Sequence, residues 1–133
     1  MTSIVVYNGD LRATSTHIKS NQSFITDAPT DNHGKGAAFS PTDTVATALA
    51  SCMLTVMGIK ANELGVDLVN TKAEVTKTMA SNPRRISRVE VLITFPDTYS
   101  QKTKKMLEQT AKTCPVLNSL HPEMEKVVRF AYS

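Results

Sequence analysis

Residues 40 to 60, SPTDTVATALASCMLTVMGIK, decide the fold of this chain. Ser40 is a good N-cap, and Pro41 fits the first helical position, where its missing N–H costs nothing. Asp43 stands three residues after the cap and can accept a hydrogen bond from the cap's own N–H. The stretch therefore predicts a long helix that begins at Pro41 and runs to about Glu63.

This predicted helix carries apolar side chains on nearly all of its faces. A helix that is apolar nearly all round is expected to be buried on most of its sides. In a chain of 133 residues, one route to such burial is a second subunit. One face carries, at helical spacing, Val45, Leu49, Cys52, Val56 and Ile59, and the other faces are largely apolar too, with Ala46, Ala48, Ala50, Met53, Leu54 and Met57.

Length and composition predict one soluble globular domain over residues 1–133, since 41% of the residues are hydrophobic and 20% are charged. The N-terminus has no basic segment followed by an apolar one, so we expect a cytoplasmic protein. A membrane helix needs about 18 apolar residues in a row. The best run here is interrupted by Thr47, Ser51 and Thr55, so we expect no membrane span.

The net charge is +3, a small excess rather than a basic arm. The densest basic stretches are KTKK at 102–105 and PRRISR at 83–88. Neither is interleaved with the aromatic side chains on which single-stranded nucleic acids stack. We therefore expect no nucleic-acid partner.

Shorter patterns flank the long helix. Runs with β-branched residues and turn formers between them predict strands, and a Ser or Cys cap predicts each further helix. Alternation in RVEVLITF, residues 88–95, predicts a strand with one buried face and one partly wet face. The order of elements indicates an α+β domain with mainly antiparallel sheet. The expected strands are 3–7, 11–18, 23–28, 66–79, 86–96 and 126–133, and the further helices are 101–113 and 115–121.

The two cysteines, Cys52 and Cys114, raise a question of chemistry. A buried free cysteine usually behaves as a small hydrophobe, so both could be core residues. Cys114 precedes Pro115 and falls at a predicted helix N-cap, with Lys112 nearby, and both features favour a thiolate. The two thiols could form a redox pair if the fold brings them together, which their spacing alone does not decide.

Two stretches, SPTDTVATALASCMLTVMGI and TCPVLNSLHP, resemble the OsmC/Ohr family of thiol-dependent peroxidases, and the resemblance covers essentially the whole chain. It implies an N-terminal three-stranded β meander, a central cysteine helix, two long strands, and C-terminal helices with a last strand. It further implies an intertwined homodimer in which the two cysteine helices are central.

The resemblance also implies roles for the thiols. Cys52 would be the peroxidatic cysteine and Cys114 the resolving one. Family members reduce organic hydroperoxides, often better than hydrogen peroxide, and need no metal, haem or flavin. The disulfide is commonly returned to dithiol by a lipoylated protein or another dithiol donor.

Burial disfavours the Cys52 thiolate that peroxide chemistry requires, so a cation or a hydrogen-bond donor must offset the desolvation. In the family an arginine of the N-terminal strands often does this, which points to Arg12. Lys19 is the other cation nearby, but it lacks the planar fork that binds a carboxylate with two hydrogen bonds.

The family holds that arginine with a glutamate one or two residues after the helix-opening proline. Here those positions are Thr42 and Asp43, and Asp43 has the shorter side chain. Its alternative role is to accept a hydrogen bond at the Ser40 cap, and one carboxylate could serve both purposes. Asp27 and Asp31 are the other candidate carboxylates.

These departures leave two further functions open. The chain could be a non-peroxidatic relative, a ligand-binding or redox-sensing dimer that keeps the fold and the thiols. It could also be a structural dimer in which both cysteines are core residues.

Overall fold

A computed structural model describes residues 1–133, which form two compact units, Met1–Val45 and Ala46–Ser133. The elements confirm the predicted α+β class, with an N-terminal three-stranded sheet, one long helix and a second sheet. The expectation of a single domain over 1–133 stays a prediction.

The first unit is an antiparallel meander of β1 (Ser3–Gly9), β2 (Arg12–His17) and β3 (Ser23–Asp27). A bulge between Tyr7 and Gly9 ends the first hairpin, and the register of the second places Arg12 opposite Asp27. A short 3-10 helix, η1 (Thr30–Asn32), follows in the loop before α1 begins at Pro41.

The meander has no apolar core of its own. Its two buried residues, Asp27 and Ser40, are both polar. Large apolar side chains of this unit are exposed instead: Ile4, Val5, Val6, Tyr7, Phe24 and Phe39. A three-stranded sheet needs an apolar face packed on something to be stable, so this unit depends on apolar contacts beyond its own strands.

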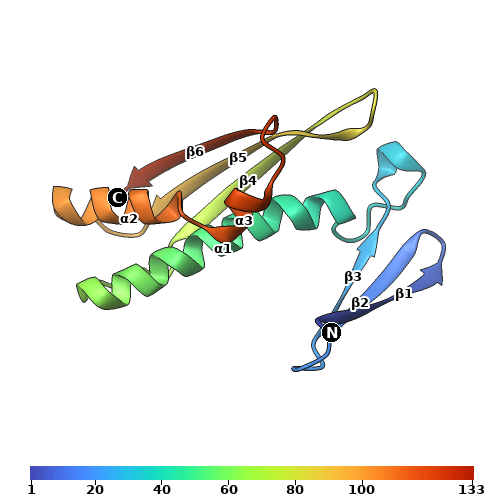
Figure 1. Ribbon diagram of the computed structural model, residues 1–133, viewed down its shortest axis with the longest axis horizontal. Helices are drawn as coiled ribbons and strands as arrows, with labels where there is room; N and C mark the ends of the chain where they lie inside the picture. The colour runs from blue at the N-terminus through green and yellow to red at the C-terminus, as the bar shows by residue number, and fades with distance from the viewer. The chain divides into compact units, whose positions relative to one another are not determined.

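The second unit contains most of α1 (Pro41–Leu64), a sheet and two shorter helices. Strand β5 (Arg85–Phe95) lies between β4 (Lys72–Ala80), antiparallel to it, and β6 (Glu125–Tyr132), parallel to it. A parallel neighbour requires a crossover. It is made by α2 (Gln101–Ala111) and α3 (Pro115–Ser119), which lie with α1 along the sheet (Figure 1).

The core lies between β5 and the helices. Alternate residues of β5 are fully buried: Val89, Val91, Ile93 and Phe95. They belong to one cluster with Leu49, Met53 and Met57 of α1 and with Leu107, Ala111 and Cys114. The alternation predicted for β5 is therefore confirmed.

Within one chain, α1 is buried on one side, whereas burial on most sides was predicted. Val45 is 38% exposed and Ile59 is 58% exposed. The buried stripe runs instead along Ala46, Leu49, Ala50, Met53, Met57 and Ala61. Alanines lie on the packed side because they let the helix backbone approach closely, and the bulkier branched residues are left on open faces.

By length and composition α1 is apolar enough to cross a membrane, with a mean hydropathy of 1.5 over its most apolar window, of which 33% is buried. The expectation that no run here is long enough was therefore wrong. The core helix of a soluble protein passes the same test.

Strand β4 begins at Lys72, six residues later than predicted. The intervening residues form turns because the Asp67 carboxylate accepts a hydrogen bond from the Val69 N–H at 2.8 Å, and Asn70 adopts a left-handed φ of 73°. Such local hydrogen bonds of Asp and Asn compete with strand pairing. Helices α2 and α3 each end two residues before their predicted C-termini.

Candidate functional site

The cysteine helix begins with a capping box. The Asp43 N–H donates to Ser40 Oγ at 3.1 Å, and the Ser40 N–H donates to the Asp43 carboxylate at 2.9 Å. These reciprocal bonds satisfy two groups that a helix start would leave without partners. The capping role predicted for both residues is confirmed.

Cys52 lies midway along α1, one residue before the fully buried Met53, and it is half-buried. The side chain is packed against the core cluster, of which Cys114 is a member. Cys52 is neither a fully enclosed core residue nor a surface thiol. A thiol at such a position remains open to a reagent that enters from one side.

Cys114 is the N-cap of α3, as predicted, and it has no exposed surface. Its sulfur accepts a hydrogen bond from the Leu117 N–H at 3.3 Å. Burial nevertheless raises the pKa of the Cys114 thiol, and the neighbouring Cys52 raises it further. The expectation of a thiolate-prone Cys114 was therefore wrong, because desolvation outweighs the backbone N–H groups of a helix only five residues long.

The two cysteines are neighbours in the fold. Cys52 lies near enough to Cys114 to raise its pKa, it packs against the core cluster to which Cys114 belongs, and both are free thiols. The fold thus brings together two residues that are 62 positions apart in the sequence. Chemically, a pair of this kind can lose two electrons and two protons and close into a disulfide.

In the first unit, Arg12 and Asp27 form a two-pronged ion pair. The Arg12 Nε donates to Asp27 Oδ1 at 2.7 Å and Nη2 donates to Oδ2 at 2.8 Å. The side chain of Asp27 is 4% exposed and that of Arg12 is 40% exposed. The hydrogen bond from Arg12 lowers the pKa of the Asp27 carboxyl and, from the other side, raises the pKa of Arg12.

This pair changes the assignment of the carboxylate that holds Arg12. The sequence pointed first to Asp43 and kept Asp27 as an alternative. Asp27 is the residue that forms the fork-to-fork pair, because strand register puts it directly opposite Arg12. Arg12 and Asp43 belong to the first unit, and the two thiols belong to the second.

Sequence reasoning missed two features beside the thiols. The first is the Leu117 N–H that binds the Cys114 sulfur, for which the only signal was the Cys-Pro helix start. The second is an open hollow of about 590 Å³ lined by Lys112, Leu117, Lys126, Val127 and Val128. No group of three or more histidine, cysteine, aspartate or glutamate side chains is arranged to hold a metal ion.

The candidate site is therefore a pair of neighbouring free thiols on an α+β scaffold. Residues 33–127 match the model of the OsmC-like protein family, and this segment contains both cysteines. The chain belongs to the OsmC-like family.

Solved structures agree with this assignment. A protein of Psychrobacter arcticus 273-4, provisionally assigned to the osmotic stress induced and detoxification response, is 54% identical, with a TM-score of 0.95 over 98% of this chain and 95% of that one. An organic hydroperoxide resistance protein of Legionella pneumophila is 18% identical, with a TM-score of 0.73 over 100% of this chain and 97% of that one.

A third structure, a provisionally assigned organic hydroperoxide resistance protein of Vibrio cholerae with captopril in one of its active sites, is 15% identical. It has a TM-score of 0.72 over 99% of this chain and 91% of that one. At such low identity the last two structures show the shared fold alone. No match was found among curated protein sequences.

Proposed function

We propose that this chain is a cysteine-based peroxidase that reduces organic hydroperoxides, and hydrogen peroxide less well, in defence against oxidative stress. The single observation that carries the proposal is the proximity of the free thiols of Cys52 and Cys114 in an OsmC-like fold. The hydroperoxide resistance proteins that share this fold support the choice of substrate.

In the proposed reaction, the Cys52 thiolate attacks the distal oxygen of the hydroperoxide. The O–O bond breaks, Cys52 becomes a sulfenic acid, and the alkoxide leaves and takes up a proton. The Cys114 sulfur then attacks the Cys52 sulfur, and the hydroxyl group leaves as water. The two thiols have supplied two electrons, and the products are an alcohol, water and the Cys52–Cys114 disulfide.

The state of Cys114 suits this sequence of steps. Burial raises the pKa of Cys114 and favours its neutral thiol, which does not repel a Cys52 thiolate. Cys52, the more exposed of the two, would act first, and Cys114 would resolve the intermediate.

We further propose that Arg12 supplies the positive charge that stabilises the Cys52 thiolate. Support comes from its fixed side chain, which is held by Asp27 through two hydrogen bonds and still has its Nη1 free of carboxylate contacts. Asp43 would act with Arg12 in addition to its role at the helix cap. Variants of these residues test the assignment, as set out below.

The working form would be a homodimer in the cytoplasm, where a dithiol is kept reduced. Support for the dimer comes from exposed apolar residues: Ile59 and Val69, 58% and 70% exposed, line one hollow along α1.

Light scattering after size exclusion should give twice the chain mass for the native protein. Ile59→Lys should shift it toward the mass of one chain, whereas Lys60→Gln should not.

The first test is a thiol count. The protein is treated with one equivalent of cumene hydroperoxide, the free thiols are alkylated, and the products are weighed by mass spectrometry. Loss of both thiols with a Cys52–Cys114 disulfide supports the peroxidase. Two thiols still free would contradict it.

One observation favours a second function, a non-peroxidatic ligand-binding or redox-sensing dimer. The position of the family's glutamate is held by Asp43, and its carboxylate is already engaged at the helix cap. In that case the thiol count would be unchanged by peroxide, while diamide, which oxidises thiols without a peroxide, would still close the disulfide.

A further inference from the structure

The charge of this chain is unevenly distributed. Four lysines and one glutamate lie between Gln101 and Lys112, a net charge of +3, which equals the net charge of the whole chain. The other eleven basic side chains are balanced by eleven acidic ones. The excess is therefore concentrated on α2 and the residue that caps it.

Three of these lysines form one stripe on the helix surface. Lys102, Lys105 and Lys112, with Gln109 between the last two, are all exposed and recur every three or four residues. This spacing keeps them on one face over about 15 Å. None of the three has a carboxylate partner within the chain, whereas the arginines of the outer sheet face do, as with Arg88 and Arg129 on Glu90.

The one acidic residue of α2 is drawn away from the lysine stripe. The Tyr132 O–H donates to the Glu108 carboxylate at 2.7 Å, which turns Glu108 toward the sheet. The fourth lysine, Lys104, leaves the stripe as well and lies 4.5 Å from the centre of the Tyr132 ring. Tyr132 thus removes the only negative charge from the neighbourhood of the stripe.

The charge order of α2 is unfavourable for the helix itself. The first turn carries lysine and no acidic residue, although the positive end of the helix dipole favours carboxylates there. Such an arrangement lowers helix stability by a few tenths of a kcal/mol per charge. Lys102 in the first turn opposes the helix dipole, whereas Lys112 at the C-terminal cap is favoured by it. The N-terminal end of the stripe therefore suits recognition better than folding.

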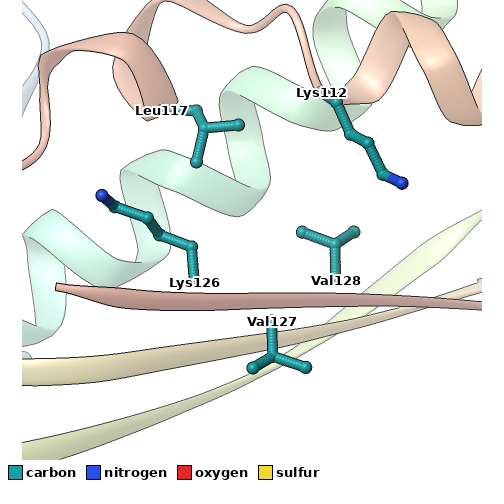
Figure 2. A pocket seen from close by; sticks show the side chains of 5 residues that line it. All are labelled: Lys112, Leu117, Lys126, Val127 and Val128. Atoms are coloured by element: carbon teal, nitrogen blue, oxygen red, sulfur yellow. The ribbon is translucent and has the colours of Figure 1, made fainter. Parts of the chain in front are cut away.

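The stripe ends at the reactive thiols. Lys112 caps α2 two residues before Cys114, and it borders the hollow that Leu117 and Val128 also line. Figure 2 shows Leu117 and Val128 in the space between the stems of Lys112 and Lys126, with Val127 on the other side of β6. The Leu117 N–H is the group that binds the Cys114 sulfur. Positive charge therefore leads to an apolar hollow beside the resolving cysteine.

We propose that the lysine stripe of Lys102, Lys105 and Lys112 is the docking surface for an acidic protein that carries the reducing dithiol. This rests on the proposed function, because it assumes that a Cys52–Cys114 disulfide must be reduced. Charge complementarity selects an acidic partner. The stripe itself consists of lysines and Gln109 and contains no aromatic side chain on which a nucleic acid could stack. Such a charged surface favours a short-lived protein encounter, and a reductant must leave after each turnover.

The exchange balances as follows. One partner thiolate attacks the sulfur of Cys52, the more exposed cysteine, and forms a mixed disulfide while Cys114 leaves and takes up a proton. The partner's second thiol then attacks the partner sulfur in that mixed disulfide, closes the partner's own disulfide and releases Cys52. Two electrons and two protons pass from the partner to the chain.

The test uses two peptides with the same Cys-Gly-Pro-Cys dithiol, one extended by a run of glutamates and the other by glutamines. The protein is oxidised with diamide, so that the test does not depend on turnover of a peroxide. Reduction of the disulfide is followed by alkylation and mass spectrometry, at low salt and at about 0.5 M NaCl, where charge interactions are screened.

We expect the glutamate peptide to react about tenfold faster than the glutamine peptide at low salt, as for electrostatically steered encounters. Lys102→Gln/Lys105→Gln/Lys112→Gln and high salt should both remove this advantage. The control Lys19→Gln/Lys60→Gln/Lys72→Gln, which loses the same charge elsewhere, should keep it. Dithiothreitol should reduce all three proteins at equal rates.

Equal rates for the two peptides on the native protein would overturn the proposal, as would an advantage that survives in the α2 triple variant. Binding provides an independent readout. The glutamate peptide with serines in place of its cysteines should bind the reduced native protein and the control, and should bind the α2 variant more weakly. Loss of peroxide chemistry with this binding intact would reject the peroxidase and leave the docking surface standing.

Discussion

The thiols of Cys52 and Cys114 are neighbours although α1 holds one and the start of α3 the other. Their proximity depends on the pairing of β5 with β6, because the crossover between these strands carries α2 and α3 over the sheet face that α1 occupies.

Substitution of each cysteine separates their proposed roles. Cys52→Ser should abolish consumption of cumene hydroperoxide, because no thiolate attacks the peroxide. Cys114→Ser should allow one turnover and then hold a sulfenic acid, detectable as a dimedone adduct by mass. Serine is a good N-cap, so this variant should keep α3. Full activity in Cys52→Ser would show that the mechanism is wrong.

Substitution of Arg12 tests whether its planar fork is needed. Arg12→Lys keeps the charge but loses the paired hydrogen bonds to Asp27, so we expect kcat/KM for cumene hydroperoxide to fall by at least about tenfold. Arg129→Lys, on the outer face of the other sheet, is the matched control and should retain activity. Equal activity of both variants would leave Arg12 with a structural role.

Acid stability should depend on Asp27. Its pKa is lowered in the folded chain, mainly by the hydrogen bond from Arg12, so the folded state binds fewer protons than the unfolded state there. The stabilisation is present above the ordinary carboxyl range and is lost as the pH falls through the lowered pKa. Urea midpoints at about pH 7 and pH 3 should therefore differ less in Asp27→Asn than in the native protein. The exposed Asp10→Asn provides the comparison and should keep the native difference.

The helix cap can be separated from catalysis at Ser40 and Asp43. Ser40→Ala should lower the free energy of unfolding by about 1 kcal/mol, and Ser40→Gly by only a few tenths, both with normal kcat/KM in the folded protein. Asp43→Asn should also lower stability, and if Asp43 acts with Arg12 it should reduce kcat/KM as well. An Asp43→Asn variant that loses stability alone would confine this residue to the cap.

Alkylation of Cys114 should require a higher pH than alkylation of an ordinary cysteine. Burial is the largest cause of its raised pKa and remains in a Cys52→Ala variant. The rate of reaction with iodoacetamide should therefore rise at higher pH in the folded variant than in the same protein in urea. Because the folded pKa is the higher one, the associated stability is present below the ordinary thiol pKa and is lost as the pH rises through the folded value. Identical profiles in the two states would contradict this account.

The sequence by itself determined the features that depend on residues close together in the chain. The Ser-Pro-x-Asp start predicted the capping box of α1, and Cys-Pro predicted the N-cap of α3, because a cap is made within a few residues. Alternation predicted which residues of β5 are buried, and the spacing of the thiol motifs predicted the OsmC-like family. At Asp67–Asn70, the local hydrogen bonds of turns compete with strand pairing, so the predicted start of β4 was too early.

Only the tertiary structure decided what depends on packing between distant segments. An all-round apolar helix does not say which face meets the sheet, and close approach selected the side of Ala46 and Ala50 over that of Val45 and Ile59. Asp27 is the partner of Arg12 because strand register places the two residues opposite each other, whereas the sequence had pointed first to Asp43 at the start of α1. The direction of the Cys114 pKa shift was predicted wrongly for the same reason. The helix start that favours the thiolate was visible in the sequence, but the burial that outweighs this effect exists only once the chain has folded.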